Sequence, residues 1–291
     1  LMIPMMVLSG AMFSFDKLNR SVGSFDRVPL IAEFMPTKWG YEALVVLQFK
    51  DNEFQKHFYQ IEKGERNANY KLVYYIPELE KRLQYCIDHV NSQDSAEVQE
   101  RMREALAVLH RGIGQEMAVF APEVPFEYLR NLQPDSVDEV ALYETVGYLE
   151  ALKEHYNEIF QAKNQQRDAI VNHLVATQPR LYEAKRNAYH NESIADLATK
   201  AFEKNKILLF KDELVQQYDP VYRDPVPTSA LDIRSHFLAP RKHLLGQFFD
   251  TFWFDLAMIW VMSLVLYVSL HVEFLRRMGN LFSWVRRRIK K

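Results

Sequence analysis

Hydrophobic positions are most concentrated near the C-terminal end of the chain, in the run Phe248–Val272. The last 17 residues of this run, Leu256–Val272, contain no Asp, Glu, Lys or Arg. As a helix they would span roughly 25 Å, and the aromatic residues just before them extend the span toward the ~30 Å of a bilayer core. The pattern predicts one transmembrane helix within residues 236–273, which include the segment leading into it. The alternative on the same pattern is a buried helix in a large soluble core.

A basic cluster follows this apolar run. The tail, residues 274–291, contains seven Lys and Arg side chains: Arg276, Arg277, Arg286, Arg287, Arg288, Lys290 and Lys291. Positive charge directly after a transmembrane helix favours the cytoplasmic side of a membrane and attracts anionic lipid. We therefore predict a cytoplasmic tail.

A second apolar run, residues 1–15, opens the chain but is too short to cross a bilayer. It is expected to be the end of a transmembrane helix, with an ordinary buried segment as the alternative. Because the chain begins at Leu1 rather than at a start methionine, we expect a longer parent protein. Residues 16–54 are a polar link followed by two short amphipathic pieces, Pro29–Pro36 and Thr37–Phe49, with Thr37 as the expected N-cap of the second. Their length and polarity suit re-entrant or interfacial helices.

Residues 55–235 are polar, and their periodicity is mainly helical. Helices are predicted at Pro77–His89, at Ser95–Gly112 (ended by Gly112 and Gly114), at Val137–Thr177, at Arg180–His190 and at Ser193–Asn205, with a strand at Ile207–Phe210. Leu142, Val146, Leu149, Leu152, Tyr156 and Ile159 form a coiled-coil-like seam on the longest helix. The run after Pro179 could fold back against that helix, so 137–190 is interpreted as an arm. The fold class is therefore a mainly α-helical membrane protein piece with a large helical external domain.

Charge is distributed unevenly along the chain, although the formal net charge is only −2. Residues 51–235 contain 22 Lys and Arg against 31 Asp and Glu, a balance of −9. No basic stripe suits a nucleic acid there, so no nucleic-acid partner is expected. The mean hydropathy of −0.26 indicates that most of the chain is exposed to water. Cys86 is the only cysteine, which excludes an intramolecular disulfide and any metal site built from cysteines.

Motifs for catalysis are missing from the sequence. It contains no G-x-x-x-x-G-K-[S/T], so this piece cannot itself hydrolyse ATP, and no G-x-G-x-x-G, G-x-S-x-G or H-E-x-x-H. Glu150, Glu154 and Glu158 share a helix face beside His155, but a solvated face explains them better than a metal site. We predict no catalytic, cofactor or metal residue in this chain. Within the apolar run, Asp255 and His271 are the ionisable residues nearest the lipid core. Their positions near its ends favour contact with the membrane interface, with a functional role as the alternative.

Two segments resemble White-type (G-subfamily, ABC-2-like) ABC transporters. The first carries Leu8-Ser9-Gly10, Pro36-Thr37-Lys38-Trp39-Gly40-Tyr41-Glu42-Ala43-Leu44 and Asn52-Glu53-Phe54, which are similar to the end of the fifth transmembrane helix and the re-entrant helices of that family. The spacing from Pro36 to Trp39 is one residue longer than the common pattern. The second segment, from Leu231 to Trp260, resembles the approach to the sixth and last helix in bacterial (Bacteroidetes-like) members. Residues 55–235 depart from the family, since they replace a short external loop that is often disulfide-bonded.

The resemblance implies a parent transporter with an ATP-binding domain and six helices, in which two such units form a dimer. ATP and Mg²⁺ would bind elsewhere in the longer chain. Leu8, Met12 and Phe13 match the neighbourhood of the apolar plug in the translocation path, with plain helix packing as the alternative. Trp39, Tyr41 and Glu42 match the re-entrant hairpin at the outer mouth.

The function predicted from these observations is part of the transmembrane domain of an ATP-driven ABC exporter of unknown substrate. It would lie in the cell inner membrane, with a cytoplasmic C-terminus and a periplasmic insert that contacts a periplasmic partner or the second transporter half. The alternative is a single-span, membrane-anchored helical scaffold that associates through the seam Leu142–Ile159.

Overall fold

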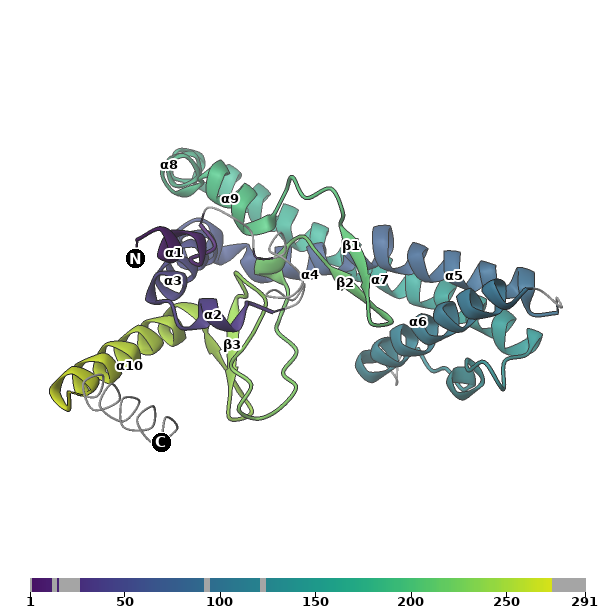
Figure 1. The fold of residues 1–291 in the computed structure, drawn as a ribbon. Coiled ribbons are helices and arrows are strands. Elements are labelled where there is room, and N and C mark those ends of the chain that lie inside the picture. Colours follow the sequence, from purple (N-terminus) through teal and green to yellow (C-terminus); the bar gives the residue numbers. More distant parts are fainter. Residues whose placement is uncertain (1, 12–14, 16–26, 92–94, 121–123, 274–291) are drawn as a thin grey trace, which may run out of the picture. The chain divides into compact units, whose positions relative to one another are not determined.

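The computed structural model describes residues 2–11, 15, 27–91, 95–120 and 124–273, and it is mainly helical, as predicted (Figure 1). The chain divides into two compact units. Unit 1 comprises Leu1–Leu47 together with Pro225–Lys291, and unit 2 comprises Gln48–Asp224. The polar insert therefore forms a unit of its own, whose limits lie earlier in the chain than the predicted 55 and 235.

Unit 2 is built on a long helical rod. Helix α4 (Tyr59–Tyr70) continues through a π-helical segment (Lys71–Tyr75) into α5 (Ile76–His89) without a break. The predicted helix after Pro77 is confirmed, and the helix before it was not foreseen. A proline inside a helix clashes with the carbonyl four residues earlier, and a wider π turn directly before Pro77 relieves that clash.

Helix α6 (Ala96–Phe120) runs antiparallel to α5 and is longer than predicted. The expectation that Gly112 and Gly114 end it is wrong. A Cβ at Gly112 would lie 3.0 Å from the Tyr75 hydroxyl and 3.1 Å from Leu79, so this glycine permits close approach of α6 to the rod. Its carbonyl also accepts a hydrogen bond from Tyr75, at 3.2 Å. Gly112 therefore allows α6 to pack closely on the rod, and it does not end the helix.

Helix α7 (Glu139–Thr177), capped by Asp138, is confirmed and packs along the whole rod. Contacts of Asn91 with Glu139, of Glu80 with Lys153 and of Glu65 with Arg167 show that it runs antiparallel to α4 and α5. The seam predicted on α7 lies inside the core of unit 2, where Leu142, Leu149 and Leu152 are 0–1% exposed. The seam is therefore not a free surface for association, because α5 and α6 already cover it.

Helix α8 (Pro179–Tyr189) follows α7 but does not pack back on it as a second arm. It buries none of its residues. Tyr182 instead contacts the ring of Phe54, with centroids 5.6 Å apart. Helix α9 (Glu192–Thr199) is capped by Asn191, whose side chain accepts a hydrogen bond from the Ile194 N–H, so the cap lies two residues before the predicted start.

A β-hairpin completes unit 2. Strand β1 (Ile207–Phe210) is confirmed, and it pairs antiparallel with β2 (Glu213–Gln216), which was not predicted. Lys211 and Asp212 connect them, both with positive φ, as in the tight turns that suit hairpin twist. Short 3₁₀ segments lie at Gln55–His57, Tyr128–Asn131 and Pro220–Tyr222.

Unit 1 contains most of the residues named in the resemblance, whereas Asn52-Glu53-Phe54 belong to unit 2. The described helices and strands of unit 1 are α1 (Met2–Val7), α2 (Leu30–Glu33), the part of α3 (Pro36–Lys50) up to Leu47, β3 (Arg241–Leu244), β4 (Gln247–Asp250) and α10 (Thr251–His271). The prediction that Thr37 caps the second short helix is wrong, because α3 begins at Pro36 and the Thr37 hydroxyl donates to the Met5 carbonyl. The start of the apolar run was also misassigned, since Phe248 and Phe249 belong to the β3–β4 hairpin.

Helix α10 is the one helix of the described residues that is long and apolar enough to cross a membrane. Its 21 residues have a mean hydropathy of 1.8 in the most apolar window, only 11% of which is buried. Asp250 caps its first turn by accepting a hydrogen bond from the Phe252 N–H. Trp253, Trp260 and Leu264 are each more than 60% exposed, so α10 presents an apolar surface that water would solvate poorly.

The core of unit 2 can be tested at Leu149, which is 1% exposed. Leu149→Ala should lower the free energy of unfolding by about 2–5 kcal/mol, because it leaves a cavity among helices that are already packed. Leu181→Ala on α8, where the side chain is 49% exposed, is the matched control and should change it by less than about 0.5 kcal/mol. Urea unfolding followed by far-ultraviolet circular dichroism measures both. Equal effects would contradict the assigned core.

Candidate functional site

The most unusual group of side chains in unit 1 is an ionic network centred on Glu42. Its Oε1 lies 2.6 Å from Lys242 Nζ and its Oε2 lies 2.9 Å from Lys38 Nζ. Oε1 also accepts a hydrogen bond from the Leu238 N–H, at 2.9 Å. Glu42 and both lysines are at most 1% exposed. Charges are seldom buried so completely unless each has partners, and here one carboxylate bridges two ammonium groups.

The first half of the network is built locally by α2 and α3. Lys38 and Glu42 are four residues apart on α3, which places them on one helix face. Lys38 also pairs with Glu33 of α2, at 3.0 Å. Trp39 Nε1 donates to the Glu33 carbonyl, and Lys38 Nζ lies 3.5 Å from the centre of the Trp39 ring. These contacts close α2 onto the start of α3.

The second half comes from the segment that leads into α10. Lys242 belongs to β3, and its ammonium group also donates to the Ser235 hydroxyl, at 2.7 Å. The β3–β4 hairpin runs directly into α10, whose first residue, Thr251, donates from its hydroxyl to the Ala239 carbonyl, at 2.6 Å. Through Lys242, the network therefore joins the short helices α2 and α3 to the base of the apolar helix.

Asp255, on the second turn of α10, lies beside this network. It is 0% exposed, and neither carboxylate oxygen has a hydrogen-bond partner among the described residues. It is close enough to Lys38 for their charges to interact. The expectation that Asp255 reaches the membrane interface is therefore wrong, because the folded hairpin and α3 bury it. His271, in contrast, is exposed at the end of α10 and stacks on Tyr267.

The electrostatics keep the α3 charges ionised. Burial alone would raise the pKa of Glu42, but the ammonium groups of Lys242 and Lys38 outweigh it and lower this pKa below its ordinary value of 4.5. Burial alone would lower the pKa of Lys38, yet Glu42 and Glu33 hold it above its ordinary value. Glu42 therefore contributes stability that is complete above pH 4.5 and is lost as the pH falls through its lowered pKa.

The structure distributes the predicted site residues among different surroundings. Trp39 and Glu42 are 0% exposed and belong to the network, whereas Tyr41 stacks on Phe237 with ring centroids 6.2 Å apart. Leu8 packs against a small cluster formed by Phe15, Val28 and Ala32. Met12 and Phe13, which complete the predicted plug, lie outside the described residues. In the structure described, Trp39 and Glu42 are buried side chains that hold elements together, and their place at an outer mouth stays a prediction.

Lys38, Lys242 and Asp255 complete the site, and the first two were not predicted. The spacing of Lys38 and Glu42 was a usable signal, since oppositely charged residues four apart on a helix often pair. Lys242 had no comparable signal, because Glu42 is 200 residues away in the chain. The network can position the elements it joins, and the complete burial of its ionic groups excludes water from it.

Comparison of the chain with protein-family models, with curated proteins and with solved structures found no match.

The two buried carboxyl groups of this site should differ in how strongly amide substitution affects stability. Glu42→Gln should lower the free energy of unfolding of unit 1 by about 3–5 kcal/mol, because it leaves two buried ammonium groups without their shared counter-ion. Asp255→Asn should change it by about 1 kcal/mol or less, because Asp255 accepts no hydrogen bond that the amide would lose. Unfolding followed by tryptophan fluorescence in mixed micelles reports on unit 1, which contains all four tryptophans of the chain, Trp39 among them. A larger effect for Asp255→Asn than for Glu42→Gln would contradict the assignment of Glu42 as the centre of the network.

Proposed function

We propose that this chain is part of the transmembrane domain of an ATP-driven exporter of the ABC class, located in the cell inner membrane. The observation that carries the proposal is an exposed apolar helix, α10, whose base is fastened to the α2–α3 hairpin by the Glu42 network. At about 1.5 Å per residue, its 21 residues are roughly 32 Å long, which matches a bilayer core. The resemblance of Trp39-Gly40-Tyr41-Glu42-Ala43-Leu44 to the re-entrant helices of White-type transporters supports the same proposal.

In this proposal the network has a mechanical role. A hairpin joined to the last helix through buried ion pairs moves with that helix as one body. A movement of the helix would therefore be transmitted to the outer end of the membrane domain. ATP and Mg²⁺ would act on the ATP-binding domain of the longer parent chain. Unit 2 would lie in the periplasm, where it would contact a periplasmic partner or the second transporter half.

A single-span, membrane-anchored helical scaffold is the second candidate. It is favoured by one observation, that α10 is the one helix long and apolar enough to span a membrane among the residues described. Its proposed means of association is weakened, because the α7 seam is covered by α5 and α6. The coding sequence upstream of Leu1 separates the two candidates. A P-loop and further apolar spans are expected for the exporter, and a stop codon just before Met2 would contradict it.

The proposed orientation predicts a pattern of thiol labelling. Ala169 on α7 is exposed, and Ala169→Cys should react with a membrane-impermeant maleimide once the reagent has entered the periplasm, with no need to break the inner membrane. Wild-type protein is the matched control, because Cys86 is 0% exposed and burial raises the pKa of its thiol to about 12. If Ala169→Cys were labelled only after lysis of the inner membrane, the proposed orientation would be wrong.

A further inference from the structure

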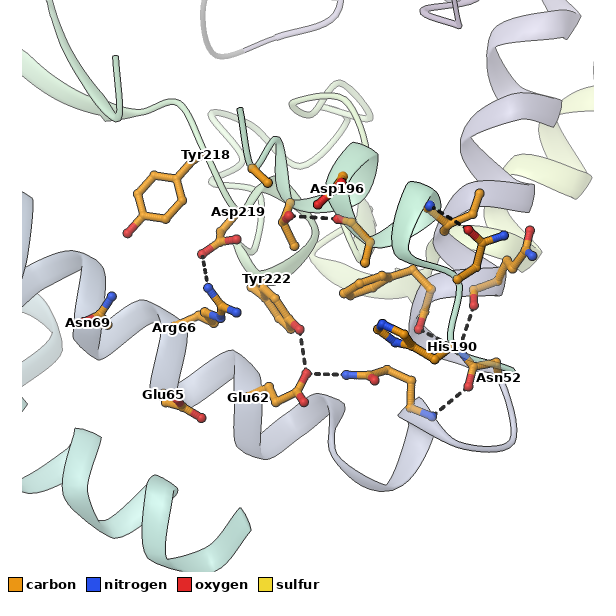
Figure 2. A pocket seen from close by; sticks show the side chains of 18 of the residues that line it. Asn52, Glu62, Glu65, Arg66, Asn69, His190, Asp196, Tyr218, Asp219 and Tyr222 are labelled. Atoms are coloured by element: carbon orange, nitrogen blue, oxygen red, sulfur yellow. Dashed lines mark hydrogen bonds and ion pairs between the residues drawn. The ribbon is translucent and has the colours of Figure 1, made fainter. Parts of the chain in front are cut away.

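Unit 2 contains a pocket of about 490 Å³ that the proposed transport function does not use. It lies between α4, α9 and the segment that carries Tyr218, Asp219 and Tyr222 (Figure 2). Its volume falls within the range of about 300–1,000 Å³ that small-molecule sites occupy. All residues that line it belong to unit 2.

One face of α4 supplies the polar floor of the pocket. Glu62, Glu65, Arg66 and Asn69 recur at steps of three, one and three residues, which keeps them on the same side of the helix. Figure 2 shows Arg66 reaching from α4 toward Asp219, and Tyr222 toward Glu62. Opposite walls of the pocket thus meet through polar side chains.

Some of these groups already have structural partners. Glu62 accepts hydrogen bonds from the Tyr222 hydroxyl, at 2.7 Å, and from Gln55. Glu65 is held by Arg167 through two hydrogen bonds, at 2.7 and 2.9 Å. These carboxylates are therefore occupied in holding α4 to its neighbours.

Asp219 is in a different situation. It is 1% exposed, yet its Oδ2 has no hydrogen-bond partner among the described residues. The closest cation, Arg66 Nη1, is 4.0 Å away, which is beyond hydrogen-bond distance. The Asp219 backbone is held in the left-handed region, at φ 54°, and its N–H donates to the Thr199 carbonyl at 2.8 Å. The fold thus holds the Asp219 carboxylate in the pocket wall without placing a hydrogen-bond donor on its Oδ2.

An unsatisfied buried carboxylate lowers stability, because it gives up hydration without gaining donors. Consistently, burial raises the pKa of Asp219 to about 6, although Arg66 and Lys206 partly oppose that rise. A group of this kind at the wall of a pocket is a candidate ligand contact. The ligand would supply the missing donor.

We propose that this pocket binds a neutral, hydroxyl-rich ligand of the carbohydrate class. Asp219 would accept a hydrogen bond from one ligand hydroxyl, and Arg66, whose side chain is 52% exposed, would donate to a neighbouring ligand oxygen. The gap of 4.0 Å between them is too long for a direct hydrogen bond and suits a pair of adjacent hydroxyl groups.

The remaining lining favours the same chemistry. Acidic and basic side chains nearly balance, with Glu62, Glu65, Asp196 and Asp219 against Arg66, Arg167 and Lys206, so the pocket does not select strongly for charge. Five amide side chains, which can both donate and accept, line it: Gln48, Asn52, Gln55, Asn69 and Asn191. The rings of Tyr74 and Tyr189 are incompletely buried and offer apolar faces to the C–H face of a sugar ring.

The inference is independent of the proposed export function, since the pocket belongs wholly to unit 2. The probes are maltotriose, cellotriose and chitotriose, tested one at a time on the full chain in lipid nanodiscs made without glycoside detergent. Isothermal calorimetry should show binding of at least one trisaccharide, with a dissociation constant on the order of 0.1 mM. Binding of none of the three overturns the proposal.

Substitutions locate the site. Asp219→Asn keeps the shape and tolerates the left-handed backbone, and it should weaken binding at least tenfold because a charge-assisted hydrogen bond is lost. Arg66→Gln should also weaken binding. Asp212→Asn is the matched control, because Asp212 also has positive φ but lies exposed in the β1–β2 turn, and it should leave binding unchanged within about twofold. Unaltered binding in both Asp219→Asn and Arg66→Gln would overturn the proposed site.

A pH series and a competing ligand class complete the test. Wild-type affinity should fall as the pH drops through about 6, where Asp219 gains a proton, while Asp219→Asn shows no change there. The charged groups around Asp219 are Arg66 on α4, Lys206 before β1 and Asp196 on α9. Binding of the zwitterion dialanine in place of the trisaccharides, with the same dependence on Asp219, would overturn the assigned ligand class.

Discussion

The bridge formed by Glu42 between Lys38 and Lys242 is the interaction on which the organisation of unit 1 depends. It brings together elements from both ends of the chain, α3 and the β3–β4 hairpin, and it does so out of contact with water. Buried ion pairs of this kind contribute little net stability compared with apolar packing, but removing one member is costly. The network is therefore better understood as a device that specifies one arrangement of α2, α3 and the base of α10.

Unit 2 differs from unit 1 in that apolar packing is the main interaction that holds it together. The α4–α5 rod, α6 and α7 bury a continuous core, and the α7 seam is part of that core. A group of polar side chains of this unit lines the pocket beside α9, where Asp219 is buried without a hydrogen bond to its Oδ2 among the described residues. One unit thus combines a buried ionic network with an exposed apolar helix, and the other is a helical unit with a pocket of its own.

Local patterns predicted local structure well and tertiary partners poorly. The periodicity of Leu142, Leu149 and Leu152 correctly indicated a long helix, but a seam has the same period whether it packs within a unit or against another chain. The glycines at 112 and 114 predict a helix end, but the structure uses Gly112 to make room for Tyr75. Tyr75 lies 37 positions away in the chain, so no local pattern indicates this contact. The buried state of Asp255 depends on the β3–β4 hairpin, which interrupts an apolar run that otherwise resembles uninterrupted helix. Lys242 and Asp219 likewise acquire their roles only from residues that the fold brings to them.

A double-mutant cycle at Glu42 and Lys242 tests the central claim most directly. The free energy of unfolding of unit 1 would be measured for wild type, Glu42→Gln, Lys242→Met and the double variant, by tryptophan fluorescence in mixed micelles. If the two side chains form the link between α3 and the base of α10, their effects will be non-additive, with a coupling energy of about 1–3 kcal/mol. Effects that add to within about 0.5 kcal/mol would contradict the account.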